Sequence, residues 1–292
     1  MSGSTPMMLH NQKIENKMVG KHGIVDVRFE KTLNKTVLRN EFSRIPLKII
    51  KPFYPEEDGT AYLTIISPTG GHVGGDKLEF RFEIAKDSKA LITTQGATKI
   101  YKSIDESVCS SMDISIAENG TFEFVPDPII PFANSSYVQN VNVEMHENAK
   151  FLYAETLYQG RAASGESFDY TLLELRLKVR MNGIPILTDS LMIKPQDSNI
   201  GNEGLFESYP FLGSFYIIGE TRKNLLSITT EADTLLSDKE EIIGGSTIFL
   251  DKGVMIRFLS KSAISLREYY YNLWNISRKI LLKKESILLR KL

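Results

Sequence analysis

Short runs of alternating apolar and polar residues follow one another along most of the chain. A period of two places successive side chains on opposite faces, so each run predicts a β-strand with one buried face. The pattern therefore predicts a mainly β protein. The expected strands cover residues 24–29, 61–66, 78–84, 90–94, 112–116, 121–125, 137–145, 151–157, 170–180 and 184–193.

Two Asn-Gly dipeptides, Asn119-Gly120 and Asn182-Gly183, each stand between alternating segments. Asn-Gly favours the positive φ angles of a type I′ turn, which is typical of a two-residue β-hairpin. We therefore expect an antiparallel hairpin at each position.

Three segments, 84–91, 116–123 and 145–152, share an outline of apolar strand end, polar turn with Asp or Asn, and apolar strand start. Their offsets of 32 and 29 residues are in the range that indicates stacked structural units. Chance similarity between β-turns is the alternative. If the units stack, the chain forms a layered, solenoid-like β-structure with few helices.

The last part of the chain changes to helical spacing over residues 262–282. Ser262 or Ser265 can cap this helix. The helix either packs on the sheets or serves a partner protein, with Tyr270 and Trp274 as the expected anchors. Residues 1–20 are polar and unpatterned, so we expect a flexible tail followed by one β domain over residues 21–292 that ends in this helix.

The composition is that of a globular protein, with 42% hydrophobic and 24% charged residues among 292. The net charge of -1 predicts neither a nucleic-acid nor a membrane partner. Cys109 is the only cysteine, which excludes an intramolecular disulfide and paired-cysteine metal sites. No leader pattern and no apolar run of about 18 residues is present, so we expect a cytoplasmic protein.

A glycine-rich segment, SPTGGHVGGDKL, covers residues 67–78. The spacing from Gly70 to Gly75 copies half of a Walker A loop, but that loop requires a lysine where Asp76 stands and a helix where a strand is expected. Nucleotide binding is therefore excluded. The glycines instead predict a sharp corner between strands, with His72 and Asp76 near one turn; a histidine that faces water is the alternative.

Polar residues interrupt three of the expected strands. If the repeat stacks, these interruptions recur at one level and form a polar seam through an apolar body, which His72 joins from the glycine loop. The alternative is a set of turns capped by their own side chains. The remaining residues of the expected seam are Gln95, Thr98, Lys99, Asp127, Glu155, Gln159 and Arg161.

Four segments resemble a known family: GGDKL (74–78), TTQGATKIYKS (93–103), VPDPIIPFANSSYVQ (125–139) and ETLYQGRAASGESF (155–168). They are similar to the urease accessory protein UreD family, called UreH in some bacteria. The resemblance covers most of the chain from about residue 20, while residues 221–241 are too generic to compare.

The resemblance implies a scaffold that is not an enzyme and has a helical, layered β-fold. Members of the family bind the urease apoprotein and UreF, which recruits the GTPase UreG with its nickel. The assembly passes Ni²⁺ to the urease active site. The resemblance thus implies transient Ni²⁺ and no permanently bound cofactor.

Within that picture, Asp76, Glu155 and Glu166 are the expected carboxylates of a nickel passage, with Lys99 and Arg161 as their counter-charges. Ni²⁺ is high in the divalent affinity order, so sparse oxygen ligands release it more readily than a cage of His and Cys.

Two other functions remain open from the sequence. One is a carboxylate-dependent hydrolase on a β-solenoid scaffold, for which Asp76, Asp127, Glu155 and Glu166 are candidates. The other is a structural adaptor through which no metal passes.

Overall fold

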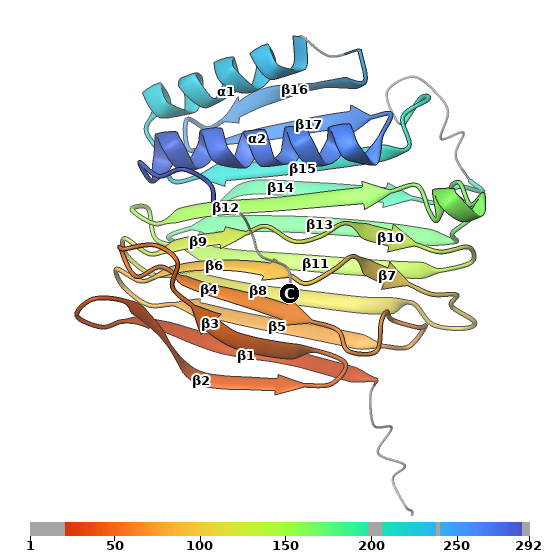
Figure 1. The fold of residues 1–292 in the computed structure, drawn as a ribbon, viewed down its shortest axis with the longest axis horizontal. Helices are drawn as coiled ribbons and strands as arrows, with labels where there is room; N and C mark the ends of the chain where they lie inside the picture. The colour runs from red at the N-terminus through yellow and green to blue at the C-terminus, as the bar shows by residue number, and fades with distance from the viewer. Residues whose placement is uncertain (1–20, 198–205, 238–239, 288–292) are drawn as a thin grey trace, which may run out of the picture.

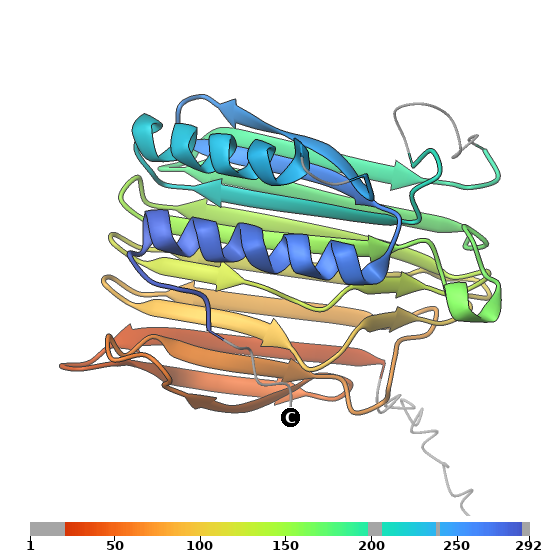
Figure 2. The ribbon, with the colours of Figure 1, turned by 45° about the horizontal axis from the view of Figure 1, so that its top comes forward.

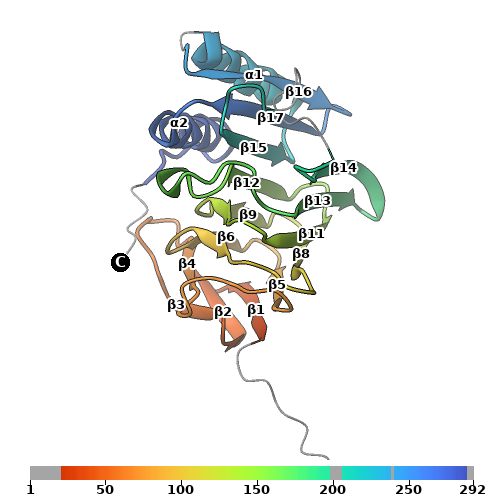
Figure 3. The same cartoon turned by 90° about the vertical axis from the view of Figure 1, so that its right-hand side faces the viewer.

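The computed structural model describes residues 21–197, 206–237 and 240–287, and the tail expected for residues 1–20 lies outside these ranges. The described residues form seventeen β-strands, two α-helices and a short 3₁₀ helix, Ala162–Ser164. The strands form two stacked sheets (Figure 1), and Figure 3 shows both helices outside the second sheet. The expected layered β-fold is confirmed, and each of the ten expected strands is present.

The first sheet has seven strands in the order β14-β13-β11-β8-β5-β1-β2. The five inner strands run parallel to one another, namely β1, β5, β8, β11 and β13. The edge strands β2 and β14 pair antiparallel with their neighbours. Their bounds are β1 His22–Lys31, β2 Thr36–Arg44, β5 Lys77–Ile84, β8 Val108–Ile116, β11 Ser136–Met145, β13 Leu172–Met181 and β14 Ile184–Ile193.

The second sheet has ten strands, eight of them in the order β16-β17-β15-β12-β9-β6-β4-β3, and β10 pairs with β12 and β7 beside this path. Four neighbouring strands of this order run parallel, namely β4, β6, β9 and β12. The strands on either side of them, β3 at one end and β15, β17 and β16 at the other, pair antiparallel. The bounds are β3 Lys48–Phe53, β4 Ala61–Ile66, β6 Lys89–Thr94, β7 Thr98–Ile100, β9 Thr121–Phe124, β10 Ile129–Pro131, β12 Lys150–Tyr158, β15 Phe211–Ile218, β16 Ile242–Phe249 and β17 Gly253–Ser260.

The repeat in the sequence is a structural repeat. At each of the three repeated segments the chain passes from the first sheet to the second, from β5 to β6, from β8 to β9 and from β11 to β12. Ile116 is in register with Ile84 on one side and Met145 on the other, and these are the first positions of the three repeated segments. The solenoid-like stacking is therefore confirmed.

One of the two expected hairpins is wrong. Asn182-Gly183 joins the antiparallel strands β13 and β14, as expected. Asn119-Gly120 instead joins β8 of the first sheet to β9 of the second. Asn119 does adopt a positive φ of 57°. The dipeptide thus produces a tight turn, but parallel pairing with the neighbouring coils decides which sheet the next strand enters.

The helices cover the outer face of the second sheet (Figure 2). α1 (Arg222–Ser237) lies in the segment that the sequence left open, and α2 (Ala263–Leu281) is the expected C-terminal helix. The Ser262 hydroxyl caps α2 by accepting a hydrogen bond from Ser265 N. Within the described ranges, neither helix has the length and apolarity that a membrane span requires.

Apolar side chains form one core between the two sheets and a second core between the outer sheet and the helices. Consequently β12 and β15 are buried on both faces. Inward positions of β12, β11 and β15 meet in the first core, where Tyr153, Tyr137 and Tyr216 lie. Polar side chains occupy other inward positions of these strands, and they form part of the candidate site.

Candidate functional site

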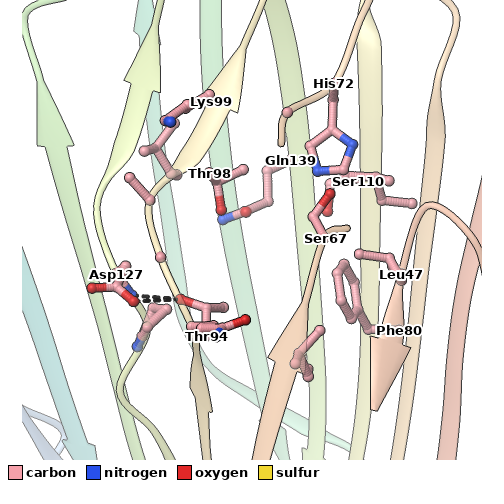
Figure 4. A pocket seen from close by; sticks show the side chains of 18 of the residues that line it. Leu47, Ser67, His72, Phe80, Thr94, Thr98, Lys99, Ser110, Asp127 and Gln139 are labelled. Carbon is pink, nitrogen blue, oxygen red and sulfur yellow. Dashed lines mark hydrogen bonds between the residues drawn. The ribbon is translucent and has the colours of Figure 1, made fainter. Parts of the chain in front are cut away.

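A cavity of about 440 Å³ lies between the two sheets. Apolar side chains such as Phe80, Met112 and Phe124 form part of its wall. Figure 4 shows that polar side chains from the glycine loop and several coils project into the same space. Six residues of the expected polar seam line it: His72, Gln95, Thr98, Lys99, Asp127 and Glu155.

The glycine loop is a corner between β4 of the second sheet and β5 of the first, as the sequence predicted. His72 N donates to the Lys99 carbonyl (2.9 Å), and the His72 carbonyl accepts from Tyr101 N (2.7 Å). A Cβ atom on Gly71 would lie 2.5 Å from the Tyr101 ring. The loop therefore requires a glycine to bring the His72 backbone against β7.

Asp76 lies behind His72 and is not among the residues that line the cavity. Its carboxylate accepts a hydrogen bond from Val73 N (3.0 Å), and its Oδ2 is 3.8 Å from Nδ1 of His72. Both side chains are buried. Burial lowers the pKa of His72, which the negative charge of Asp76 opposes, so the imidazole is favoured in its neutral form.

Asp127 is held at the rim of the cavity by Thr94. Its backbone N–H donates to Thr94 Oγ1 (2.8 Å), and that hydroxyl donates to the Asp127 carboxylate (3.2 Å), as Figure 4 shows. Lys99 and Gln95 are exposed on the same side. This side of the cavity is therefore open to solvent and charged.

Glu155 is the buried carboxylate of the cavity. Its Oε1 accepts hydrogen bonds from Gln139 Nε2 (2.5 Å) and Tyr153 Oη (2.6 Å). Tyr137 Oη in turn donates to Gln139 Oε1 (2.9 Å). Burial raises the pKa of Glu155 to about 7, although the hydrogen bond from Tyr153 acts in the opposite direction. The interior thus holds an oriented carboxyl group that is expensive to ionise.

A row of polar side chains runs from Glu155 across the second sheet; we call Glu155, Ser214 and Arg257 the polar row. Glu155 of β12 is in register with Ser214 of β15, which is in register with Arg257 of β17. Arg257 donates through Nε to Ser214 Oγ (3.2 Å) and forms an ion pair with Asp189, which also accepts from Tyr216 Oη. Side chains of Arg257 and Asp189 are 34% and 19% exposed, so the row reaches towards solvent at this end.

Glu166, Arg161 and Gln159 lie outside the cavity lining, at the end of β12. Glu166 forms an ion pair with Arg161, its expected counter-charge, and accepts from Ala133 N (3.2 Å). The hydrogen bond from Arg161 holds the pKa of Glu166 below its usual range. Gln159 accepts from Ser167 Oγ (3.0 Å). These three residues stabilise a separate loop.

Tyr270 and Trp274, the expected partner anchors, point into the second core. Trp274 is fully buried, and its Nε1 donates to Glu123 Oε2 (2.8 Å). Tyr270 is 6% exposed and meets the Phe215 ring edge-on at 5.8 Å. Both side chains thus fix α2 to the sheet, and their contribution to a partner surface stays a prediction.

Sequence reasoning missed the inner part of the site, namely Tyr137, Gln139, Tyr153, Asp189 and Arg257. A usable signal exists for Gln139. In β11, alternate positions from Tyr137 to Met145 face the first core, and Gln139 is the one amide among them. A polar side chain at an inward position of a regular strand has to find a buried partner, here Glu155.

The donors along the cavity are sparse. Among the described residues, no group of three or more His, Cys, Asp or Glu side chains is arranged to hold a metal ion. The lining instead combines one imidazole, two carboxylates and the Lys99 side chain with amide and hydroxyl groups. Such a lining suits weak, exchangeable contact with a cation rather than chelation.

Comparison with known proteins agrees with the resemblance seen in the sequence. A family model described as UreD urease accessory protein matches residues 21–291. Urease accessory protein UreD of Lachnoclostridium phytofermentans is 30% identical over 82% of this chain and 87% of its own length. The proteins of that name from Cenarchaeum symbiosum and Bacillus cereus are 28% and 26% identical, over 85% and 92% of this chain and 88% and 98% of theirs. The chain belongs to the UreD family of urease accessory proteins.

Proposed function

We propose that this chain is a non-enzymatic scaffold that binds the urease apoprotein and UreF, and that Ni²⁺ delivered by UreG passes through its interior in the cytoplasm. One observation carries the proposal. The buried Glu155 connects an open, charged cavity on one side to the partly exposed Arg257–Asp189 pair on the other.

The chemistry of this row suits a cation in transit. A divalent ion that leaves water needs oxygen or nitrogen ligands at each step, because an unpaired charge in an apolar interior is very costly. Glu155 supplies a carboxylate, and Gln139, Ser110 and Thr98 supply neutral oxygens from neighbouring strands. Arg257 opposes a bound cation, which favours release over storage.

A structural adaptor with no metal passage is the second candidate. Family membership alone supports it equally well. The buried polar row favours the passage, because an adaptor that needs only its surface would gain more stability from an apolar residue than from a buried carboxyl group at position 155.

Partner contact through α2 is part of the proposal, but through its outward side. Since Trp274 is fully buried, the helix offers instead residues such as Ile264, which is 74% exposed. Replacing Ile264 with Asp leaves the buried face intact, so we expect weaker binding to UreF or urease without unfolding. Affinity that stays unchanged for both partners would remove α2 from the partner surface.

The passage is tested by activation of urease under limiting nickel with Glu155→Gln, which keeps shape and removes charge. We expect the variant to assemble with UreF and the urease apoprotein but to lower the nickel content of urease. Glu83→Gln, on the exposed outer face of the first sheet, is the matched control. Full activation by the triple variant Asp76→Asn, Glu155→Gln, Glu166→Gln would leave the adaptor as the function.

A further inference from the structure

His72 has an unusual environment for a loop histidine. Its side chain is 3% exposed, and its enclosed Nδ1 has no hydrogen-bond partner among the residues that the structure describes. Oδ2 of Asp76 lies 3.8 Å from this nitrogen, beyond hydrogen-bond length. Buried polar atoms without partners are rare, so this nitrogen requires an explanation.

Both ends of the gap are held by the backbone. His72 forms a parallel bridge with Ile100 on β7, and Gly71 makes that approach possible. The Asp76 backbone bonds to Val73 and Cys109, while its carboxylate accepts from Val73 N. The backbones of both residues and the Asp76 carboxylate are therefore held in place by the fold.

This arrangement determines which ring nitrogen is free. A proton on Nδ1 faces the negative carboxylate, which favours that tautomer and leaves the lone pair on Nε2. The His72 side chain lines the cavity, and Figure 4 shows its ring on the side where Ser110 and Gln139 lie. Histidines that bind metals usually donate their other N–H to a carboxylate; Asp76 stands in that position here, at 3.8 Å and without a hydrogen bond.

We propose that Nε2 of His72 is a ligand for a late first-row divalent cation in the cavity, and that Asp76 is the positioning residue that orients the imidazole. The assignment of nickel as the physiological cation rests on the proposed function; the site itself does not. Oxygen donors of the cavity and water complete the coordination.

The consequence is selectivity. Carboxylates, amides and hydroxyls alone suit Mg²⁺ and Ca²⁺, whereas an imidazole favours Ni²⁺, Cu²⁺ and Zn²⁺. Of the three histidines in the described residues, His72 is the one that lines the cavity, while His22 and His146 lie elsewhere. Cys109, the only cysteine of the chain, is exposed and adds no thiolate. One nitrogen ligand thus gives preference without tight retention.

The test uses the purified full chain and the metal alone. Ni²⁺ affinity is measured by competition with a chromophoric chelator, and Cu²⁺ serves as an EPR probe of nitrogen coordination. For His72→Gln we expect at least a tenfold loss of Ni²⁺ affinity and loss of the imidazole coupling, with circular dichroism unchanged. For Asp76→Asn we expect about tenfold weaker Ni²⁺ binding with the coupling retained.

The matched controls are His22→Gln and His146→Gln, which we expect to keep both the affinity and the coupling. Wild-type values in His72→Gln, or loss of the coupling in a control variant instead, would overturn the proposal. This test of the metal site does not depend on nickel passage through the chain. If His72→Gln loses Ni²⁺ binding while Glu155→Gln still activates urease fully, the metal site is supported and the proposed function is wrong. The reverse result leaves the function and removes the site.

Discussion

Replacing Glu155 with Gln should make the folded protein less sensitive to alkaline pH. In the native chain the carboxyl group is buried, and its pKa is raised from 4.5 to about 7. Between these values the folded state holds a proton that the unfolded state releases, so unfolding is favoured as the pH rises. The stabilising contribution is therefore complete below pH 4.5 and is lost as the pH approaches 7.

The magnitude follows from the size of the shift. One pKa unit corresponds to about 1.4 kcal/mol, so ionisation of Glu155 lowers the free energy of unfolding by about 3 kcal/mol above pH 7. Glutamine has nearly the same shape and its Oε1 can accept the same hydrogen bonds from Gln139 and Tyr153, but it does not ionise. The stability difference between variant and native protein should grow by about 2 kcal/mol from pH 5.5 to pH 8.5.

Urea unfolding at several pH values measures this difference, with fluorescence of Trp274, the single and buried tryptophan, as the probe. Glu166→Gln is the control. Arg161 lowers the pKa of Glu166, so this carboxylate is ionised in both states over the same range and its stability difference should stay constant. A constant difference for Glu155→Gln as well would refute the burial and orientation assigned to Glu155.

Three further substitutions and one control variant test the packing. Gly71→Ala should destabilise the fold by about 1–3 kcal/mol in urea unfolding, because the new methyl group overlaps a tyrosine ring, whereas Gly96→Ala, with open space around it, should be neutral. Arg278→Leu should cost about 3 kcal/mol or more, since it leaves the buried carboxylate of Glu123 without its cation; native-like stability would contradict this ion pair. Trp274→Phe should cost about 1–2 kcal/mol through the lost indole hydrogen bond, measured by circular dichroism during unfolding, and an unchanged melting curve would argue against that bond.

The strands with regular alternation were predictable because one face of each is buried in the first core. β11, for example, was expected over residues 137–145 and covers Ser136–Met145, with every second side chain buried. Strands β2, β3 and β16 were not predicted, since they lie at sheet edges where much of each strand is exposed, and β7 and β10 have only three residues each. β15 and β17 were missed as well; β15 is buried on both faces and therefore shows no alternation. The sequence also left α1 open, because its apolar face is modest and recognisable only once the second sheet is in place.

For the site as well, residues within the repeat could be predicted, whereas residues outside it could not. The stacked repeat was visible in the sequence, and residues such as Gln95, Asp127 and Glu155, which it assigned to one seam, line one cavity. Glu166 failed to join them because its loop leaves the stack and pairs with Arg161 at once. Partners such as Asp189, from a distant part of the chain, could not be predicted, since contacts between the sheets depend on tertiary packing rather than on any local period.

A stacked β-structure suits a polar route because of its spacing. Neighbouring strands lie about 4.8 Å apart, so inward side chains at one level form a ladder perpendicular to the strands with steps of that length. Glu155, Ser214 and Arg257 occupy three successive rungs on β12, β15 and β17. In the proposed passage, a hydrated cation would exchange ligands between such rungs without losing all of them at once, and the guanidinium at the last rung would lower its affinity there. The guanidinium group of Arg257 therefore matters for the route as well as for stability. A lysine at this position would keep the positive charge, but it would lose the planar group that contacts both Ser214 and Asp189.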